Sequence, residues 1–270
     1  MDATLEKKRA RFAFGKNWKS YSKLIDDSRI NAAQEDLKTA LGVADLKGKT
    51  FLDIGSGSGL SSLAAHGLGA KVTSYDYDQD SVDCTVAVHQ EAGAPKTWTV
   101  QQGSVLDEKF QKSLGKFDVV YSWGVLHHTG DMWQALNNVQ HNMKKSSQLF
   151  IAIYNNQGFI SEAWKKIKKT YVTSPKIIQW GMIAIFSFYF ASKNLVHDVL
   201  NLKNPLKRYK QSARGMSVFY DWVDWIGGYP FEVASPEAIF SFYKEKGLDL
   251  TYLRTVRGSH GCNIFVFKKN

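Results

Sequence analysis

The chain has 270 residues, 44% of them hydrophobic and 22% charged, which suits one large hydrophobic core or one core with an appended subdomain. The two cysteines, Cys84 and Cys262, are far apart and lack metal-ligand spacing, and no secretion signal opens the chain. We therefore expect no disulfide scaffold, no metal site and a reducing, cytoplasmic location. The formal net charge of +10 favours contact with something anionic, such as nucleic acid, a phospholipid surface or a phosphorylated substrate.

The first predicted element is a helix that follows a basic, aromatic segment at residues 1–27. Asp27 or Ser28 can cap this helix, and Gly42 can end it. Its apolar stripe has helical spacing and consists of Ile30, Ala33, Leu37 and Leu41.

A glycine-rich turn follows an apolar strand at residues 51–54 and precedes a helix that starts near Leu60. Glycine adopts backbone angles that other residues resist and lets the main chain approach a ligand closely, so such a turn can cradle a nucleotide-like cofactor. The glycines are Gly55, Gly57 and Gly59. Dinucleotide binders need Gly-x-Gly-x-x-Gly, but here the third glycine comes one residue early. The spacing therefore disfavours an NAD-dependent oxidoreductase.

Alternating strands and helices continue to residue 154, which predicts a parallel sheet with helices on both faces. Strand two, residues 71–76, ends in Asp76, roughly twenty residues past the first glycine, where a carboxylate suits the two hydroxyls of a ribose. Further strands are expected near residues 99–104, 117–122 and 148–154, with helices from about Asp80 and from Asp131 to Met143.

The sheet is expected to be completed far downstream. Ser235 and Pro236 are typical of a helix start, and Gly247 of its end. Two alternating segments, residues 248–256 and 263–267, then predict a terminal hairpin.

Together, the glycine loop, Asp76 and this strand pattern resemble the class I S-adenosylmethionine-dependent methyltransferases. The block Asp-Trp-x-Gly-Gly-Tyr-Pro at residues 224–230 also resembles an uncharacterised bacterial subgroup of that family. The resemblance implies a doubly wound, Rossmann-like α/β sheet of seven strands, the last antiparallel. It also implies a core at residues 49–155 and 231–270, a helical flap at 1–48 and a mostly helical insert at 156–230. The first 27 residues would close over the cofactor or pack as an arm on the sheet.

The family's cofactor residues can be placed on this sequence. The cofactor would be S-adenosylmethionine and the product S-adenosylhomocysteine, with the glycine loop at the methionine end and Asp76 at the ribose. Position 104 usually holds an aspartate that binds the adenine amino group; Ser104 can still accept one hydrogen bond. The predicted cofactor-binding residues are Asp53, Gly55, Ser56, Gly57, Gly59, Asp76, Tyr77, Ser104, Val105 and Trp123.

The loop after strand four carries two adjacent histidines, His127 and His128. Histidine is suited to proton transfer near neutral pH, so either is a candidate catalytic base. The alternative is that they cover the cofactor, as this stretch does in family members where neither does chemistry. Tyr154 and Asn155 reach the same rim after strand five, and His260 in the hairpin loop is a weaker candidate.

The insert begins with a predicted helix in which Trp164, Ile167 and Tyr171 share one face beside four lysines. Residues 177–192 follow without a charge. This run is shorter than the roughly 20 residues of a membrane-spanning helix, and one crossing would separate the final hairpin from its sheet. Packing against the core or a second subunit, and contact with an anionic membrane surface, both stay open.

The second half of the insert, residues 214–231, combines aromatic rings with the acids Asp221 and Asp224. Aromatic faces beside carboxylates suit a polyhydroxylated substrate, whereas a hydrophobic hairpin with solvated acids is the alternative. The substrate candidates in this block are Arg214, Tyr220, Asp221, Trp222 and Tyr229.

We therefore predict methyl transfer to a small or lipid-linked acceptor, at an oxygen of a saccharide or natural product. An RNA methyltransferase is the alternative that the basic charge favours. A non-catalytic membrane tether built on a cofactor fold is an alternative of another class.

Overall fold

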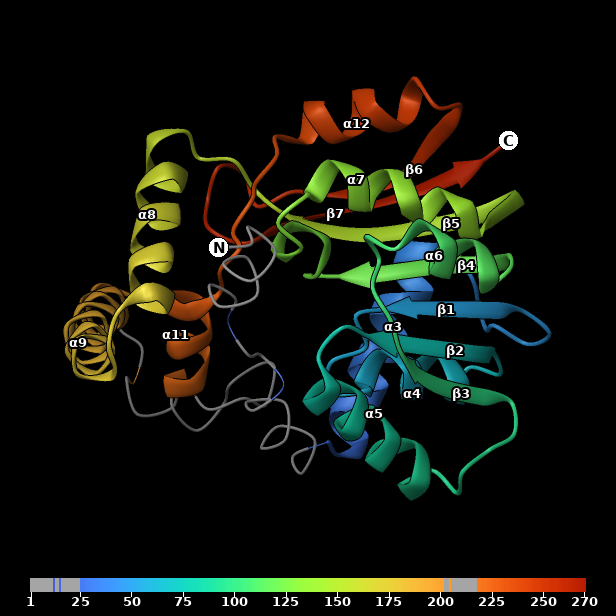
Figure 1. Cartoon of the computed structure of the whole chain (residues 1–270), viewed down its shortest axis with the longest axis horizontal. Coiled ribbons are helices and arrows are strands. Elements are labelled where there is room, and N and C mark those ends of the chain that lie inside the picture. Colours follow the sequence, from blue (N-terminus) through green and yellow to red (C-terminus); the bar gives the residue numbers. More distant parts are fainter. Residues whose placement is uncertain (1–11, 13–14, 16–24, 202–203, 205–217) are drawn as a thin grey trace, which may run out of the picture.

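A single seven-stranded sheet forms the centre of the protein (Figure 1). The computed structural model describes residues 12, 15, 25–201, 204 and 218–270. The strand order is β3-β2-β1-β4-β5-β7-β6, and β7 is antiparallel to both its neighbours, so the predicted sheet is confirmed. The strands are β1 (Thr50–Ile54), β2 (Lys71–Asp76), β3 (Trp98–Gln102), β4 (Phe117–Trp123), β5 (Met143–Tyr154), β6 (Leu248–Arg254) and β7 (Cys262–Lys269).

Helices cover both faces of this sheet and enclose two hydrophobic clusters. One face carries α3 (Asp27–Leu41), α4 (Leu60–Gly67) and α5 (Gln79–Glu91). The other carries α6 (Glu108–Ser113), α7 (Met132–Asn138) and α12 (Pro236–Lys244), together with the 3₁₀ turns Leu126–His128 and Val139–Asn142. In β1, Phe51 packs in the cluster under α3, α4 and α5. Leu52 and Ile54 pack in the cluster under α6, α7 and α12. Burial on both faces explains why the strand is apolar without alternation.

Two predicted helix boundaries were wrong. Helix α3 is capped by Asp26 rather than by Asp27 or Ser28, because the Asp26 carboxylate accepts the Arg29 N–H at 2.9 Å. The helix predicted through Met143 ends at Asn138, and β5 starts at Met143 instead. The Asn142 amide donates to the carbonyls of Gln111 (2.7 Å) and Gly115 (2.9 Å), which holds the chain in a 3₁₀ turn at this point.

The described part of the insert contains three helices: α8 (Phe159–Thr173), α9 (Lys176–Leu200) and α11 (Val218–Gly227). These helices lie together beyond the carboxyl ends of β1 and β4 (Figure 1). The predicted inner face of α8 is confirmed for Trp164 and Tyr171, which are both buried. Within the described part of the chain, no helix combines the length and the apolar character that crossing a membrane requires.

Helix α12 packs against β6, and its N-cap residue, Ser235, allows a test of the fold. The Ser235 hydroxyl accepts the Ala238 N–H at 3.2 Å. We expect Ser235→Ala to lower the free energy of unfolding by about 1 kcal/mol in urea denaturation, since a backbone donor loses its partner. The control is Ser241→Ala on the exposed side of the same helix, which should change it by less than about 0.5 kcal/mol. Equal effects would contradict the capping role.

Candidate active site

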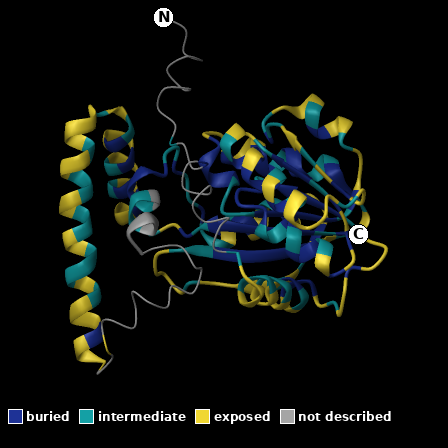
Figure 2. Ribbon diagram, turned by 90° about the horizontal axis from the view of Figure 1, so that it is seen from below, coloured by how far each residue is buried: buried dark blue, intermediate teal, exposed yellow. Residues whose placement is uncertain are grey.

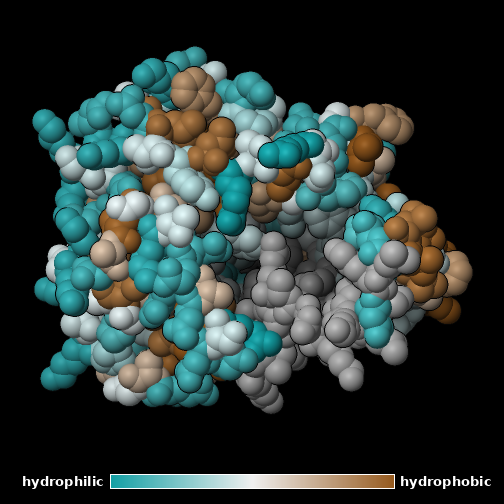
Figure 3. All heavy atoms as spheres, turned by 180° about the vertical axis from the view of Figure 1, so that it is seen from behind, coloured by the Kyte–Doolittle hydropathy of each residue, from teal (hydrophilic) through white to brown (hydrophobic). Residues whose placement is uncertain are grey.

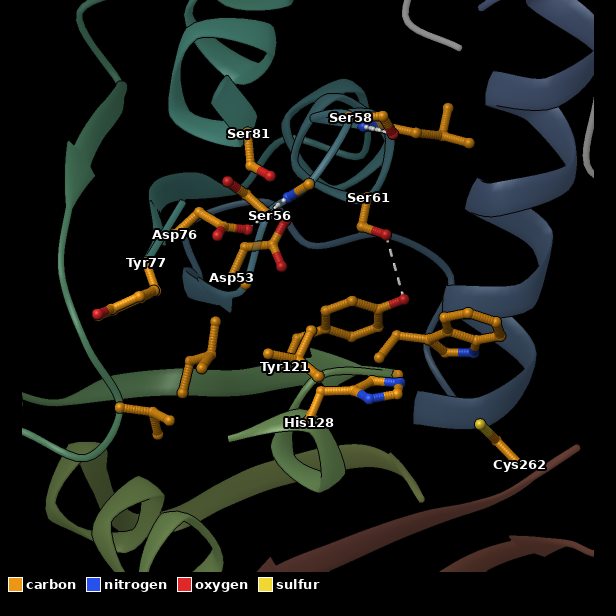
Figure 4. A pocket seen from close by; sticks show the side chains of 18 of the residues that line it. Asp53, Ser56, Ser58, Ser61, Asp76, Tyr77, Ser81, Tyr121, His128 and Cys262 are labelled. Carbon is orange, nitrogen blue, oxygen red and sulfur yellow. Dashed lines mark hydrogen bonds between the residues drawn. The ribbon is translucent and has the colours of Figure 1, made fainter. Parts of the chain in front are cut away.

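A cavity of about 990 Å³ lies where the strand order reverses between β1 and β4. Ligands of open α/β sheets bind in this position, beyond the carboxyl ends of the strands. Nine of the ten predicted cofactor residues line it; the exception, Gly59, is the N-cap of α4. Figure 4 shows Asp53 and Asp76 together beside Ser56, with Tyr121 and His128 on the other side of the space.

The glycine loop is held in one conformation by β2 and its neighbours. The N–H groups of Gly55 and Ser56 donate to the Tyr75 carbonyl at 2.8 and 3.1 Å. Gly55 has φ +78°, and a Cβ there would lie 2.5 Å from the Val125 methyls. Both facts require glycine at this position. The loop therefore presents its backbone to the cavity at Gly55, where no side chain intervenes.

The Asp76 carboxylate connects this loop to the end of β2. It accepts the N–H groups of Gly57 (3.0 Å) and Asp78 (2.9 Å). A carboxylate has about four acceptor sites, so Asp76 can also accept hydroxyl hydrogens from a ribose. Farther along the wall, the Ser104 hydroxyl accepts the Leu106 N–H at 3.2 Å and lies on the side expected for the adenine.

Asp53 is 1% exposed, and its carboxylate accepts the last hydrogen bond of a buried chain. Ser62 Oγ donates to its carboxylate at 2.6 Å and lies 2.6 Å from Ser74 Oγ, which accepts the Trp98 indole N–H at 2.8 Å. Burial raises the pKa of Asp53 to about 7; the Ser62 hydrogen bond opposes this rise, and the nearby charge of Asp76 adds to it. Sequence reasoning missed Ser62 and Ser74, because serines on buried faces carry no motif.

The two histidines have different environments. His128 lines the cavity, and its Nδ1 lies 2.7 Å from the Pro230 carbonyl. A carbonyl only accepts, so Nδ1 carries the proton and Nε2 is the basic nitrogen of the neutral ring. His127 is fully buried, is not among the cavity-lining residues described, and accepts the Tyr154 backbone N–H at Nδ1 (3.3 Å). Burial keeps the pKa of His127 well below its usual value, and the charges of His128 and Lys168 lower it further.

Aromatic rings form the wall opposite the glycine loop. Tyr154 and Trp225 both line the cavity, with ring centroids 5.5 Å apart. Tyr121 on β4 accepts a hydrogen bond from Ser61 Oγ at 3.2 Å, and burial raises its pKa far above the usual value. His260 also lines the cavity, and partial desolvation lowers its pKa, with further contributions from Lys193 and Lys168.

A buried lysine on α8 fixes Trp225 in this wall. The Lys168 ammonium donates to the Trp225 carbonyl and lies 4.2 Å from the centre of the Trp225 ring and 4.9 Å from that of Phe231. Phe12 is a further wall residue, and its N–H donates to the Tyr229 carbonyl at 2.9 Å. Trp225, Tyr121 and Phe12 were not predicted. Trp225 was signalled only by its place in the aromatic block.

Other predicted substrate residues lie elsewhere. Asn155 accepts an amide hydrogen from Asn263 at 3.0 Å and so anchors the terminal hairpin. Trp222 packs on Phe190 of α9, with centroids 5.8 Å apart. Tyr229 is not among the described lining residues. Three predictions fall outside what the structure describes: Arg214, and the side chains of Tyr220 and Asp221.

The charge of the cavity wall suits a cationic ligand. Four aspartates line it against two arginines among the described residues: Asp36, Asp53, Asp76 and Asp78 against Arg29 and Arg254. S-adenosylmethionine carries a sulfonium and an ammonium, so the wall fits its charge as well as its ribose. When bound, it supplies a methyl group on positively charged sulfur. Among the described residues, no cluster of three histidine, cysteine or acidic side chains could hold a metal ion.

Comparison with known proteins shows the family and the fold. The sequence matches the methyltransferase domain family over residues 45–205. No curated protein matches it. The fold is similar to that of magnesium protoporphyrin IX methyltransferase from Synechocystis PCC 6803 with bound SAH (TM-score 0.57, 13% identity, all of both chains covered).

Two further solved structures share the fold. One is a putative sarcosine dimethylglycine methyltransferase from Galdieria sulphuraria (TM-score 0.52, 13% identity, 89% of this chain and 85% of that one). The other is the N-terminal domain of EvdMO1 in the presence of SAH and D-fucose (TM-score 0.52, 13% identity, 91% and 84%).

The family match spans more than half of the chain. The chain belongs to the methyltransferase domain family and is an S-adenosylmethionine-dependent methyltransferase, in agreement with the prediction from its glycine loop. A non-catalytic tether is therefore set aside.

The ribose contact of Asp76 can be tested by calorimetry with S-adenosylhomocysteine. We expect Asp76→Ala to weaken binding by about 10- to 100-fold, equivalent to roughly 1.5–3 kcal/mol for a hydrogen bond to a charged acceptor. Asp83→Ala, an exposed aspartate on α5, is the matched control and should bind like the wild type. Unchanged affinity of Asp76→Ala would remove Asp76 from the site.

The raised pKa of Asp53 predicts a pH-dependent stability. Between its ordinary value of 3.8 and about 7, the folded protein holds a proton that the unfolded chain releases. The free energy of unfolding therefore falls as pH rises through this range, by at most about 1.4 kcal/mol per unit. In urea denaturation, the free energy of unfolding of Asp53→Asn minus that of the wild type should increase up to about pH 7 and then level off. A similar trend in Asp83→Asn would show that burial of Asp53 is not the cause.

Proposed function

We propose that the protein methylates an oxygen of a small or lipid-linked acceptor, of the saccharide or natural-product class. The observation that carries this proposal is the fixed orientation of His128 in the cavity. A hydroxyl acceptor must lose its proton during methyl transfer, and a neutral histidine with a basic Nε2 is suited to remove it. An acceptor with a free lone pair would need alignment alone.

In this mechanism, His128 acts as the general base. Its Nδ1–H donates to the Pro230 carbonyl at 2.7 Å, and the Tyr154 ring packs edge-on against it with centroids 5.4 Å apart. Both contacts hold the imidazole plane, so Nε2 would take the proton of the acceptor hydroxyl. Bound S-adenosylmethionine would supply the methyl group to that oxygen and, with its methyl–sulfur bond broken, leave as S-adenosylhomocysteine. His127 supports the end of β5 through its bond to the Tyr154 N–H.

The cavity wall favours an uncharged, ring-shaped acceptor. Trp225 and Tyr154 offer aromatic faces on which a sugar or a planar ring can stack. A sugar is compatible with such a fold, since the EvdMO1 domain was crystallised in the presence of D-fucose. Phe12, which belongs to the segment expected to close over the cofactor or to pack as an arm on the sheet, adds a further aromatic ring to this wall.

RNA is the less favoured acceptor. The net charge of +10 speaks for it, but the four aspartates of the cavity wall would repel a phosphate backbone at the point of transfer.

The acceptor class is tested with methyl-labelled S-adenosylmethionine. The protein is incubated separately with uncharged glycosides, phenols, primary amines and total RNA, and the label is followed by mass spectrometry. Label on hydroxyl oxygens supports the proposal. Label confined to amines or to RNA would overturn it.

The base is tested on the best acceptor of that panel. We expect His128→Asn to lower kcat by about 10²–10⁴-fold, because proton removal is lost, while affinity for S-adenosylhomocysteine stays within about threefold of wild type. The control is His141→Asn, which should keep full activity because His141 is not among the described residues that line the cavity. An unchanged kcat in His128→Asn would show that this histidine covers the site without taking the proton.

A further inference from the structure

Helix α9 exposes an apolar face along its whole length. Ile177 is 81% exposed, Phe188 77% and Leu200 77%. Figure 2 shows the helix at the edge of the molecule, and Figure 3 shows hydrophobic atoms gathered over it. The large apolar side chains of this face are Ile177, Ile178, Trp180, Ile185, Phe188, Tyr189, Leu195, Val196, Val199 and Leu200.

The inward side of α9 is apolar as well. Phe186 and Phe190 pack on Trp164 of α8, with ring centroids 5.5 and 6.0 Å apart. A helix that is hydrophobic all round is normally covered on every side. Moving large apolar side chains out of water is favourable, so a contiguous exposed face of this length marks an interaction surface.

The charges around this face identify its partner. Exposed lysines on α8 and α9 greatly outnumber exposed acids: Glu162 is the single exposed acid of the two helices, since Asp198 is 2% exposed. Lys176 and Lys193 lie on α9 itself, whereas Lys165, Lys166 and Lys169 lie on the neighbouring α8. A second copy of the chain would bring the same positive charges to the contact. Anionic headgroups would instead neutralise them, and Trp180 and Tyr189 are residue types enriched at lipid–water interfaces.

We propose that the outward face of α9 docks on the surface of an anionic phospholipid bilayer, with the helix lying in the plane of the headgroups. The apolar side chains enter the acyl boundary, and the lysines contact lipid phosphates. The helix rests on the surface and does not span the bilayer.

This contact would lie close to the acceptor end of the cavity. Trp164, which packs on α9, is also 5.4 Å from Trp225 in the cavity wall, measured between ring centroids. The aromatic rings of Trp164 and Trp225 would thus separate a lipid-linked acceptor in the bilayer from the cavity. This last step rests on the proposed function, whereas the docking itself does not.

The docking is tested by co-sedimentation of the full chain with phosphatidylcholine vesicles, with and without phosphatidylglycerol. We expect sedimentation with the anionic vesicles at low salt and a loss at high salt. Phe188→Asp should weaken this binding by about 10- to 100-fold, since one large apolar side chain is lost and an acid is added. The double variant Lys176→Glu and Lys193→Glu should weaken it on anionic vesicles.

The matched control is Phe240→Asp, a partly exposed aromatic on α12, which should bind vesicles like the wild type. Affinity for S-adenosylhomocysteine shows that each variant is folded. Absence of vesicle binding at low salt, or equal loss in Phe240→Asp, would overturn the proposal. So would light scattering that shows a dimer dissociated by Phe188→Asp in a protein that ignores vesicles. The acceptor panel is assayed without vesicles, so its outcome does not depend on docking. Failure of docking is therefore distinguishable from failure of the proposed function.

Discussion

The site depends on holding two carboxylates close together at the ends of neighbouring strands. Asp53 on β1 is buried and feels the charge of Asp76 on β2, so its pKa rises to about 7. Asp76 receives two backbone N–H groups, and Asp53 receives the Ser62 hydroxyl at the end of a buried chain from Trp98. Without a cation these groups repel one another. A positively charged ligand in the cavity would stabilise the charged form of both carboxylates, so the same arrangement that costs stability in the free protein would favour a cationic cofactor.

Methyl transfer also needs an acceptor wall, and part of that wall comes from outside the alternating strands and helices of the core. Trp225 belongs to the insert, and the buried Lys168 of α8 holds it through its carbonyl and its ring. The insert is thus packed into the cavity through a few aromatic contacts, while its far side, on α9, faces away from the protein. The two sides of this unit have different chemistry and serve different contacts.

Much of the fold could be predicted from the sequence because its signals are local. Strand periodicity, the glycines and the Ser235 cap each depend on neighbouring residues, and the predicted sheet is present with its antiparallel β7. The end of α7 could not be predicted, because Asn142 bonds to carbonyls far away in the chain. The cofactor wall followed from the family pattern. The Ser62–Ser74 chain, Tyr121 and Phe12 did not, since contacts between residues distant in sequence leave no spacing to detect.

The hydrogen bond between His128 and the Pro230 carbonyl joins the sheet rim to the last residue of the predicted insert. In the proposed mechanism, proton transfer by His128 and acceptor binding by the insert are therefore coupled through this bond, although the two residues are 102 positions apart. A chimera that replaced residues 156–230 with the corresponding segment of a relative would alter more than specificity. It would also change the carbonyl that accepts the Nδ1–H of His128 and so keeps the proton on that nitrogen. In this protein, evolution of a new acceptor has to proceed by substitutions that keep that carbonyl in place.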